Sequence, residues 1–191
     1  MKRKRIYQTL EDRGNPDYIE QNAPFKCNRR NAWLGEGYYF WDTFIENAHW
    51  WGIRNYGDNY VICEGTCLFD MEKCFDLVGN TEHLLEFGEA IEFLKKQNLV
   101  NENTTVSRIL NFMQSLPGFK YEAIRASGIN TISQHKNVNQ EFIYRIRFDK
   151  KMPQYLDYKP PIQICIFKKS SLELSKMKIV FPDEYIQDLY I

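Results

Sequence analysis

Hydrophobic residues recur with two different periods along this chain, and the changes of period divide it into predicted strands and helices. Alternating or continuous apolar runs bounded by turn residues predict strands. Such runs cover 6–9, 60–69, 121–126, 140–148, 162–167 and 177–180, with a short strand or turn at 75–79. Within 33–41, a loop with two glycines leads into four consecutive aromatic residues that predict a buried strand. Apolar spacings of three and four predict amphipathic helices. These spacings occur at 44–52, 81–97 and 106–115, and a helical turn is predicted at 18–22.

The order of these elements predicts the fold class. A strand, a helix and a strand are followed by two helices and then by several strands. This order favours an α+β fold with mixed or antiparallel sheets over a Rossmann fold, in which strands and helices alternate. Because no Gly/Ser-rich linker and no internal repeat divides the chain, we expect a single domain over residues 1–191.

Composition narrows the functional classes. The hydrophobic fraction is 43%, which is enough apolar surface for a folded core. The 25 Lys and Arg residues balance the 25 Asp and Glu residues, whereas a protein that binds mainly to the nucleic-acid backbone usually carries a basic excess. The basic run at 1–5 is interpreted as a solvated chain end.

Cysteine usage and hydropathy suggest a compartment. The five cysteines form no Cys-x-x-Cys pair, so we expect no structural metal. No apolar stretch approaches the length of a membrane span, and no signal peptide is recognisable. The simplest expectation is a cytoplasmic protein with reduced thiols and no membrane partner.

A glycine–aromatic motif, Gly35-Glu-Gly37-Tyr-Tyr39-Phe-Trp-Asp, is the most informative segment. The first glycine permits a tight turn, and the second allows the backbone to approach a ligand without an intervening Cβ. Tyr39 is expected on the same side as Gly37 because alternate strand residues share a face. A ring beside a bare backbone edge makes a slot for a flat ring that carries an amide, such as nicotinamide. The alternative is a glycine-bearing strand buried under aromatic side chains.

This motif, followed by a small residue in the next helix, resembles the central motif of the ADP-ribosyltransferases of the diphtheria-toxin and poly(ADP-ribose)-polymerase type. The agreeing positions are Gly35, Gly37, Tyr39, Phe40, Asp42 and Ala48. In that family a first strand carries a His-Gly-Ser/Thr motif, a second strand carries the glycine–tyrosine motif, and a late strand carries a glutamate. The resemblance implies a divergent, bacterial-type member with an ADP-ribosyltransferase-like α+β fold of split mixed or antiparallel sheets. It also implies NAD as substrate and a protein, a nucleic acid or water as acceptor.

The first-strand motif is altered in this chain. Tyr7 stands where the family has the histidine that holds a ribose hydroxyl, Gln8 replaces the glycine that pairs with the nicotinamide amide, and Thr9 keeps the small hydroxyl. Gln8 brings a side chain that can crowd the slot. The NAD-binding residues implied by the resemblance are Tyr7, Gln8, Thr9, Gly35, Gly37 and Phe40.

Two positions compete for the late glutamate. Gln163, in the strand near the C-terminus, can hydrogen-bond a ribose hydroxyl but cannot supply negative charge or act as a base. Glu141 restores the carboxylate in a second strand-like segment, but 50 residues then follow it, and a solvent-facing strand residue is the alternative reading. The candidate catalytic residues are Tyr39, Gln163 and Glu141.

Two functional hypotheses follow from these residues. In the first, the protein binds NAD and cleaves its nicotinamide–ribose bond, with Arg29 and Arg30 near the pyrophosphate. In the second, the same fold is a catalytically degenerate binding or interaction module. Both predict a cleft formed by two packed sheets, with residues 35–40 on its floor.

Overall fold

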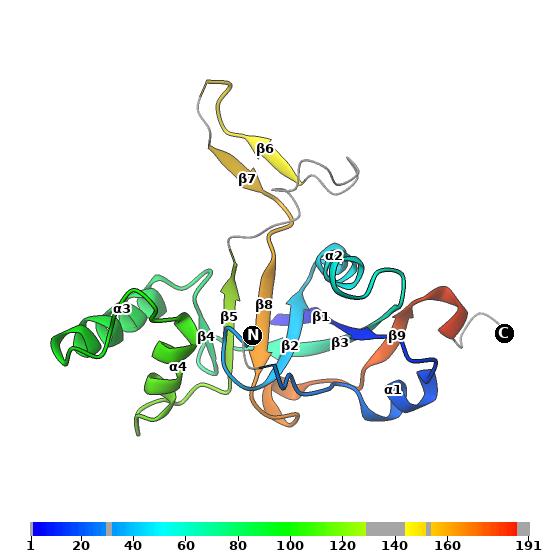
Figure 1. Ribbon diagram of the computed structural model, residues 1–191, viewed down its shortest axis with the longest axis horizontal. Helices are drawn as coiled ribbons and strands as arrows, with labels where there is room; N and C mark the ends of the chain where they lie inside the picture. Colours follow the sequence, from blue (N-terminus) through cyan, green and yellow to red (C-terminus); the bar gives the residue numbers. More distant parts are fainter. Residues whose placement is uncertain (1, 30–31, 129–143, 152–153, 187–191) are drawn as a thin grey trace.

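Strands of the chain assemble mainly into one mixed sheet (Figure 1). The computed structural model describes residues 2–29, 32–128, 144–151 and 154–186. Within these described residues, seven strands have the order β4-β5-β8-β2-β1-β3-β9, and β4 and β5 are the only parallel pair among them. Their bounds are β1 (Lys2–Glu11), β2 (Tyr38–Asp42), β3 (Tyr60–Phe69), β4 (Cys74–Asp76), β5 (Ala123–Ser127), β8 (Ile162–Ile166) and β9 (Lys178–Phe181). A separate ribbon pairs β6 (Arg145–Arg147) with β7 (Tyr155–Asp157).

Four α-helices accompany the strands in the described part of the chain. They are α1 (Pro16–Asn22), α2 (Ile45–Tyr56), α3 (Thr81–Lys96) and α4 (Val106–Gln114). The two longest predicted amphipathic segments begin at side-chain caps, as their sequences favour. The Asn80 side chain accepts from the backbone N–H of Glu82 at the start of α3, and Thr105 does the same for Arg108 in α4. The α+β class predicted from the sequence is confirmed.

The sheet consists of two halves joined at a short seam. Strands β1 and β2 pair only at Ile6 with Asp42 and at Tyr7 with Trp41, whereas β1 follows β3 along its whole length. Beyond Tyr7 the two strands diverge, and Figure 1 shows them running in different directions. The expectation of two packed sheets is therefore wrong in form. Hydrogen bonding across the seam makes the halves one continuous sheet.

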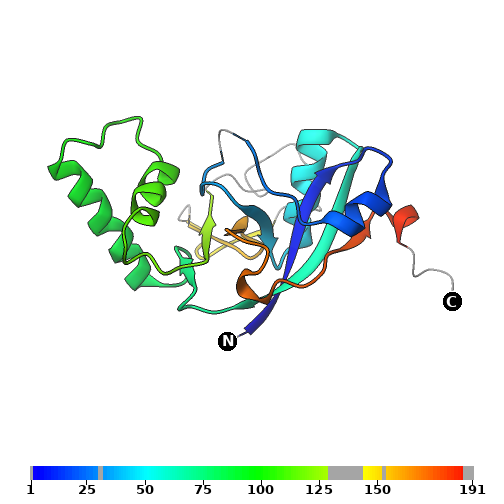
Figure 2. The same cartoon turned by 90° about the horizontal axis from the view of Figure 1, so that it is seen from below.

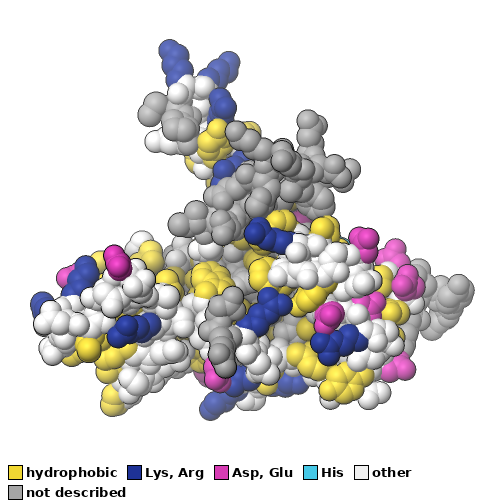
Figure 3. All heavy atoms as spheres, viewed as in Figure 1, with side chains coloured by type: hydrophobic (Ala, Val, Ile, Leu, Met, Phe, Trp, Pro, Cys, Tyr) yellow, Lys and Arg dark blue, Asp and Glu magenta, His cyan; other side chains and the backbone are white. Residues whose placement is uncertain are grey.

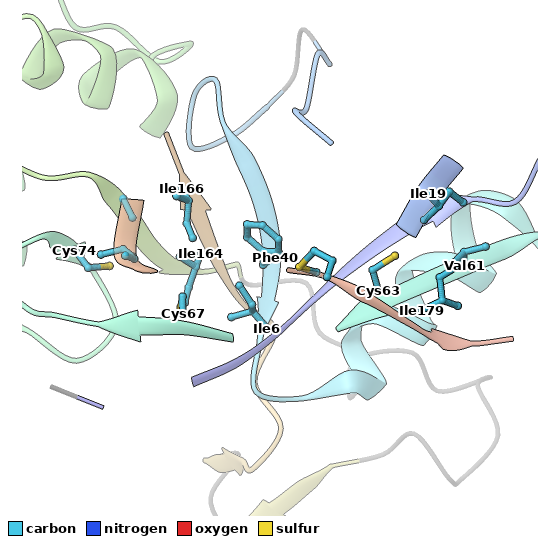
Figure 4. Close-up of a cluster of buried hydrophobic side chains, with 13 residues drawn as sticks. Ile6, Ile19, Phe40, Val61, Cys63, Cys67, Cys74, Ile164, Ile166 and Ile179 are labelled. Atoms are coloured by element: carbon cyan, nitrogen blue, oxygen red, sulfur yellow. The ribbon is translucent and has the colours of Figure 1, made fainter. Parts of the chain in front are cut away.

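One face of the sheet carries the core that Figure 4 shows in close-up. Ile6, Phe40 and Ile164 lie there on three neighbouring strands, and Ile19 of α1 joins the same cluster next to β9. These side chains are almost completely buried. Burial of this apolar surface stabilises the seam, because the core spans both halves of the sheet.

The opposite face is covered by two separate groups of helices. Helix α2 packs Ala48 against Tyr7 and Trp41. The pair α3 and α4 packs on the β4–β5–β8 half around Phe75 and Ile124. Figure 2 shows this pair at one end of the molecule and α2 at the other side of the sheet centre. The pocket described below lies over strands in the middle of this face.

A buried ion network crosses the Phe40 face of the sheet. The Asp42 carboxylate, 1% exposed, accepts hydrogen bonds from Lys4 Nζ at 2.8 Å and from Arg125 Nε at 2.7 Å. Arg125 Nη1 also donates to both oxygens of Asp76, at 3.0 and 3.2 Å. Burial alone raises the pKa of Asp42, but the hydrogen bonds from Lys4, Thr43 and Arg125 outweigh it and leave that pKa below its ordinary value. The network joins β1, β2, β4 and β5.

The tight packing around Gly37, just before β2, can be tested against an open glycine, Gly88 of α3. A Cβ at Gly37 would lie 2.5 Å from Cys165 Sγ and 2.7 Å from the Ile166 carbonyl oxygen, whereas a Cβ at Gly88 in α3 meets nothing within 4 Å. We expect Gly37→Ala to lower the free energy of unfolding by about 1–3 kcal/mol through overpacking. Gly88→Ala is expected to raise it by about 1 kcal/mol, because alanine favours the helix. Urea denaturation measures both changes, and equal effects from the two variants would contradict this packing.

Candidate functional site

A pocket of about 720 Å³ lies on the α2 face of the sheet, over strands from both halves. Its wall is formed by β1, β2 and β8, by α2 and by the loop that precedes β2. The residues that line it are Gln8, Thr9, Leu10, Phe25, Lys26, Cys27, Asn28, Arg29, Ala32, Trp33, Tyr39, Phe40, Trp41, Trp50, Trp51, Arg54, Asn55, Tyr56, Gly128, Pro161 and Gln163. Figure 3 shows hydrophobic side chains at the surface in the middle of the molecule, with lysine or arginine side chains next to them.

Aromatic rings and cations dominate this wall. The Arg29 guanidinium lies 5.4 Å from the Trp51 ring centre and donates to the Tyr56 hydroxyl at 3.0 Å. The Arg54 guanidinium lies 5.6 Å from the Trp50 ring centre. Among the described residues that line the pocket there is no aspartate or glutamate. Its chemistry therefore suits a ligand that has both flat rings and negative charge.

Tyr39 lines the pocket and also fixes the turn that precedes β2. Its hydroxyl donates to the Gly35 carbonyl oxygen at 2.7 Å and accepts from the Leu34 backbone N–H at 2.9 Å. Burial raises the pKa of this phenol far above its ordinary value. Tyr39 therefore stays neutral, and its ring, not its hydroxyl, is available to a ligand. Tyr38 packs in the core on the opposite face, as strand alternation predicts.

Gln163 reaches the same pocket from β8. It pairs with Trp41 across the sheet, and its side-chain oxygen accepts a 2.7 Å hydrogen bond from the Trp33 indole nitrogen. The residue is 9% exposed. The indole bond orients the amide and leaves its NH₂ group as the donor for a ligand.

The altered first-strand motif has a structural role. Gln8 Nε2 donates to the Phe25 carbonyl oxygen at 2.9 Å, and Gln8 Oε1 accepts from the Phe25 backbone N–H at 2.8 Å. The side chain thus occupies the fork where β1 and β2 separate and holds the preceding loop in place. Thr9 donates to the Ala48 carbonyl oxygen at 2.9 Å and ties β1 to α2. Both residues line the pocket.

The other residues implied by the resemblance lie less favourably for a ligand. Tyr7 is 3% exposed under α2 and does not line the pocket. Gly35 and Gly37 do not line it either; the space beside the Gly37 Cα is filled by Cys165 of β8. Phe40 borders the pocket, but its ring lies in the opposite core (Figure 4). Of residues 35–40, only Tyr39 and Phe40 line the pocket, so the expectation that the whole segment forms its floor is wrong.

Two predicted residues cannot be placed at the site, and three tryptophans at the site were not predicted. Glu141 and Arg30 lie outside the described residues. Sequence reasoning did not assign Trp33, Trp50 or Trp51 to the site. Trp50 and Trp51 both pack against Trp41 and line the pocket. The two adjacent tryptophans in the predicted 44–52 helix were a usable signal, because indole rings also suit flat ligands that stack.

Comparisons with known proteins found no match. No family model, no curated protein and no solved structure matches this chain. Within the part of the chain that the structure describes, no group of three or more His, Cys, Asp or Glu residues is placed to hold a metal ion. None of the described helices is long and apolar enough to cross a membrane.

Proposed function

We propose that the pocket binds NAD and that the protein acts as an ADP-ribosyltransferase of divergent type. The observation that carries the proposal is the meeting of three motifs that are far apart in the sequence. Thr9 of β1, Tyr39 of β2 and Gln163 of β8 line one pocket on three neighbouring strands. The resemblance of these segments implies this arrangement, although nothing in their spacing requires it.

The composition of the wall supports the choice of ligand. NAD carries two flat ring systems and two phosphates. The Tyr39 ring and the indoles of Trp50 and Trp51 offer stacking surfaces, and Arg29 and Arg54 offer charge to the diphosphate. Because no Asp or Glu is among the described residues of the wall, their side chains do not repel that diphosphate.

The reaction implied by the resemblance breaks the bond between nicotinamide nitrogen and ribose C1′. The bonding pair leaves with nicotinamide, positive charge develops on the ribose, and an acceptor nucleophile attacks C1′ and gives up its proton. Gln163 can donate its NH₂ group to a ribose hydroxyl and so position the sugar. It offers no negative charge to the developing cation, so we expect slow turnover unless Glu141 supplies it.

A second candidate is NAD binding without turnover. The hydrogen bond between Trp33 and Gln163 favours it, because the amide is held by the fold and replaces the carboxylate that the chemistry would use. Release of nicotinamide from NAD separates the two candidates.

NAD is expected to raise the thermal midpoint of unfolding. At a concentration about 100-fold above the dissociation constant, binding adds about 2.7 kcal/mol to the free energy of unfolding, which corresponds to about 5 °C or more for a chain of this size.

Tyr39→Ala is expected to weaken NAD binding about fivefold through loss of stacking, and Tyr38→Ala is expected to leave the affinity for NAD unchanged. Calorimetric titration measures both.

Two controls separate stacking from loss of the turn. Tyr39→Phe keeps the ring but removes the bonds to Leu34 and Gly35, so it should lose stability and keep its affinity for NAD. ADP-ribose lacks nicotinamide and should bind wild type and Tyr39→Ala alike. Absence of any NAD-induced shift, or equal losses from the Tyr38 and Tyr39 alanine variants, would remove the basis of the proposal.

A further inference from the structure

A second surface stands apart from the pocket. The β6–β7 ribbon projects from the main sheet in Figure 1 and has exposed apolar side chains. Phe148 is 69% exposed and Ile146 is 60% exposed. Tyr155, Leu156 and Tyr158 are also exposed. Soluble proteins rarely leave so many apolar side chains exposed on one element unless that element contacts a partner. This concentration of apolar surface therefore indicates a binding role.

Positive charge is concentrated on the same segment. Residues 144–159 contain five basic residues and two acidic ones, although the whole chain has equal numbers of each. The rest of the chain is therefore net negative. The basic residues are Arg145, Arg147, Lys150, Lys151 and Lys159. A local basic excess on a projecting element attracts an anionic partner.

Cations and rings are interleaved on the ribbon. Arg147 pairs with Tyr155 across the strands, and the guanidinium groups of Arg145 and Arg147 lie 5.6 and 5.7 Å from the centre of the Tyr155 ring. Ile146 pairs with Leu156 on the other face. Phe148 directly follows β6, and Lys150 and Lys151 come two and three residues after it in the sequence.

We propose that the β6–β7 ribbon binds single-stranded nucleic acid. Stacking of exposed bases on aromatic side chains, together with backbone phosphates beside Arg and Lys, is how sequence-tolerant single-strand binders work. The ribbon provides both parts within one short segment. A duplex offers the phosphates but hides the base faces, so a single strand uses this surface more completely.

The base of the ribbon lies next to the pocket, although its strands project away from it. Lys159 forms an ion pair with Glu46 of α2, and the Pro160 carbonyl oxygen accepts from Asn47 Nδ2 at 3.1 Å. The next residue, Pro161, lines the pocket. The ribbon is thus anchored at the pocket rim. The inference goes beyond the proposed function and stands whether or not the pocket binds NAD.

Fluorescence anisotropy with a labelled 12-nucleotide oligo-dT or oligo-U tests the proposal on the full chain. The triple variant Arg147→Gln, Lys150→Gln, Lys151→Gln is expected to bind at least about tenfold more weakly. The slope of log affinity against log salt is expected to become shallower by about 2, because about 0.7 counterion is released per phosphate neutralised on a single strand. Phe148→Ser is expected to weaken binding about tenfold without changing that slope.

A charge-matched control removes three exposed cations elsewhere. Lys95→Gln, Lys96→Gln, Arg108→Gln on α3 and α4 should bind the oligonucleotides as wild type does. All variants should keep the wild-type circular dichroism spectrum, and their NAD-induced thermal shift reports separately on the pocket. Three outcomes would overturn the inference: no binding of either oligonucleotide by wild type, equal losses in the control and ribbon variants, or binding of acidic peptides with no binding of oligonucleotides.

Discussion

Arg125→Met is expected to lower the free energy of unfolding by about 3–5 kcal/mol. Removing one partner of a buried ion pair leaves the remaining charge without compensation, and that cost is larger than the value of the pair itself. Arg125 serves two carboxylates, Asp42 at 2.7 Å and Asp76 at 3.0 Å, and both are buried. Asp42 keeps Lys4, whereas Asp76 has Arg125 as its only ion-pair partner among the described residues. Urea denaturation followed by fluorescence measures the loss.

The double variant separates charge imbalance from loss of packing. Adding Asp76→Asn to Arg125→Met removes the uncompensated charge, so part of the lost stability should return. Arg108→Met, an exposed change on α4, should alter stability by less than about 0.5 kcal/mol. A loss from Arg125→Met no larger than that of Arg108→Met would show that the network does not support the seam.

The same network fixes how stability responds to acid. Because the pKa of Asp42 is lowered in the folded protein, its contribution is present above the ordinary aspartate pKa and is lost as the pH falls through the lowered value. Arg125→Met removes one of the donors that lower this pKa. Its acid unfolding transition should therefore begin at a higher pH than that of wild type.

Local patterns were sufficient to predict most of the fold. The segment 60–69 coincides with β3, and the helix predicted at 81–97 ends one residue later than α3. Apolar periodicity decides such elements because they bury one face along their whole length. The aromatic run after the glycines was predicted as a strand entered through a loop, and β2 does begin at Tyr38. The Tyr39 hydroxyl holds the turn formed by Gly35 and its neighbours. That contact is a side chain folding back on its own loop, which hydrophobic periodicity does not encode.

Part of the candidate site could be predicted from sequence motifs. Thr9, Tyr39 and Gln163 were assigned from motif positions, and strand adjacency places them together. The seam between β1 and β2 could not be predicted, because it depends on where two distant strands stop pairing. Gln8 fills that fork, so a residue expected to crowd the ligand instead holds Phe25. The β7 strand was missed because three residues are too few for a periodic pattern.

Gln163→Glu is expected to raise the rate of nicotinamide release from NAD by about 100-fold. The substitution keeps the size of the side chain and places a carboxylate on the pocket wall, where the proposed reaction would develop positive charge on the ribose. One oxygen can still accept the Trp33 indole bond, which measures 2.7 Å to the wild-type amide, and the other is left for the sugar. The gain should increase with pH as the new carboxyl group ionises. Nicotinamide released over time is the measurement.

Glu141→Gln distinguishes the competing carboxylate. If Gln163 holds the family's glutamate position, wild type and Glu141→Gln should be equally slow, and Gln163→Met should be no faster. If Glu141 is the working residue, wild type should turn over NAD readily, and Glu141→Gln should abolish cleavage while NAD still raises the thermal midpoint. Gln keeps shape and hydrogen bonding but removes the charge. No nicotinamide from wild type or from Gln163→Glu, with the NAD-induced shift retained, would leave binding without turnover as the function of the pocket.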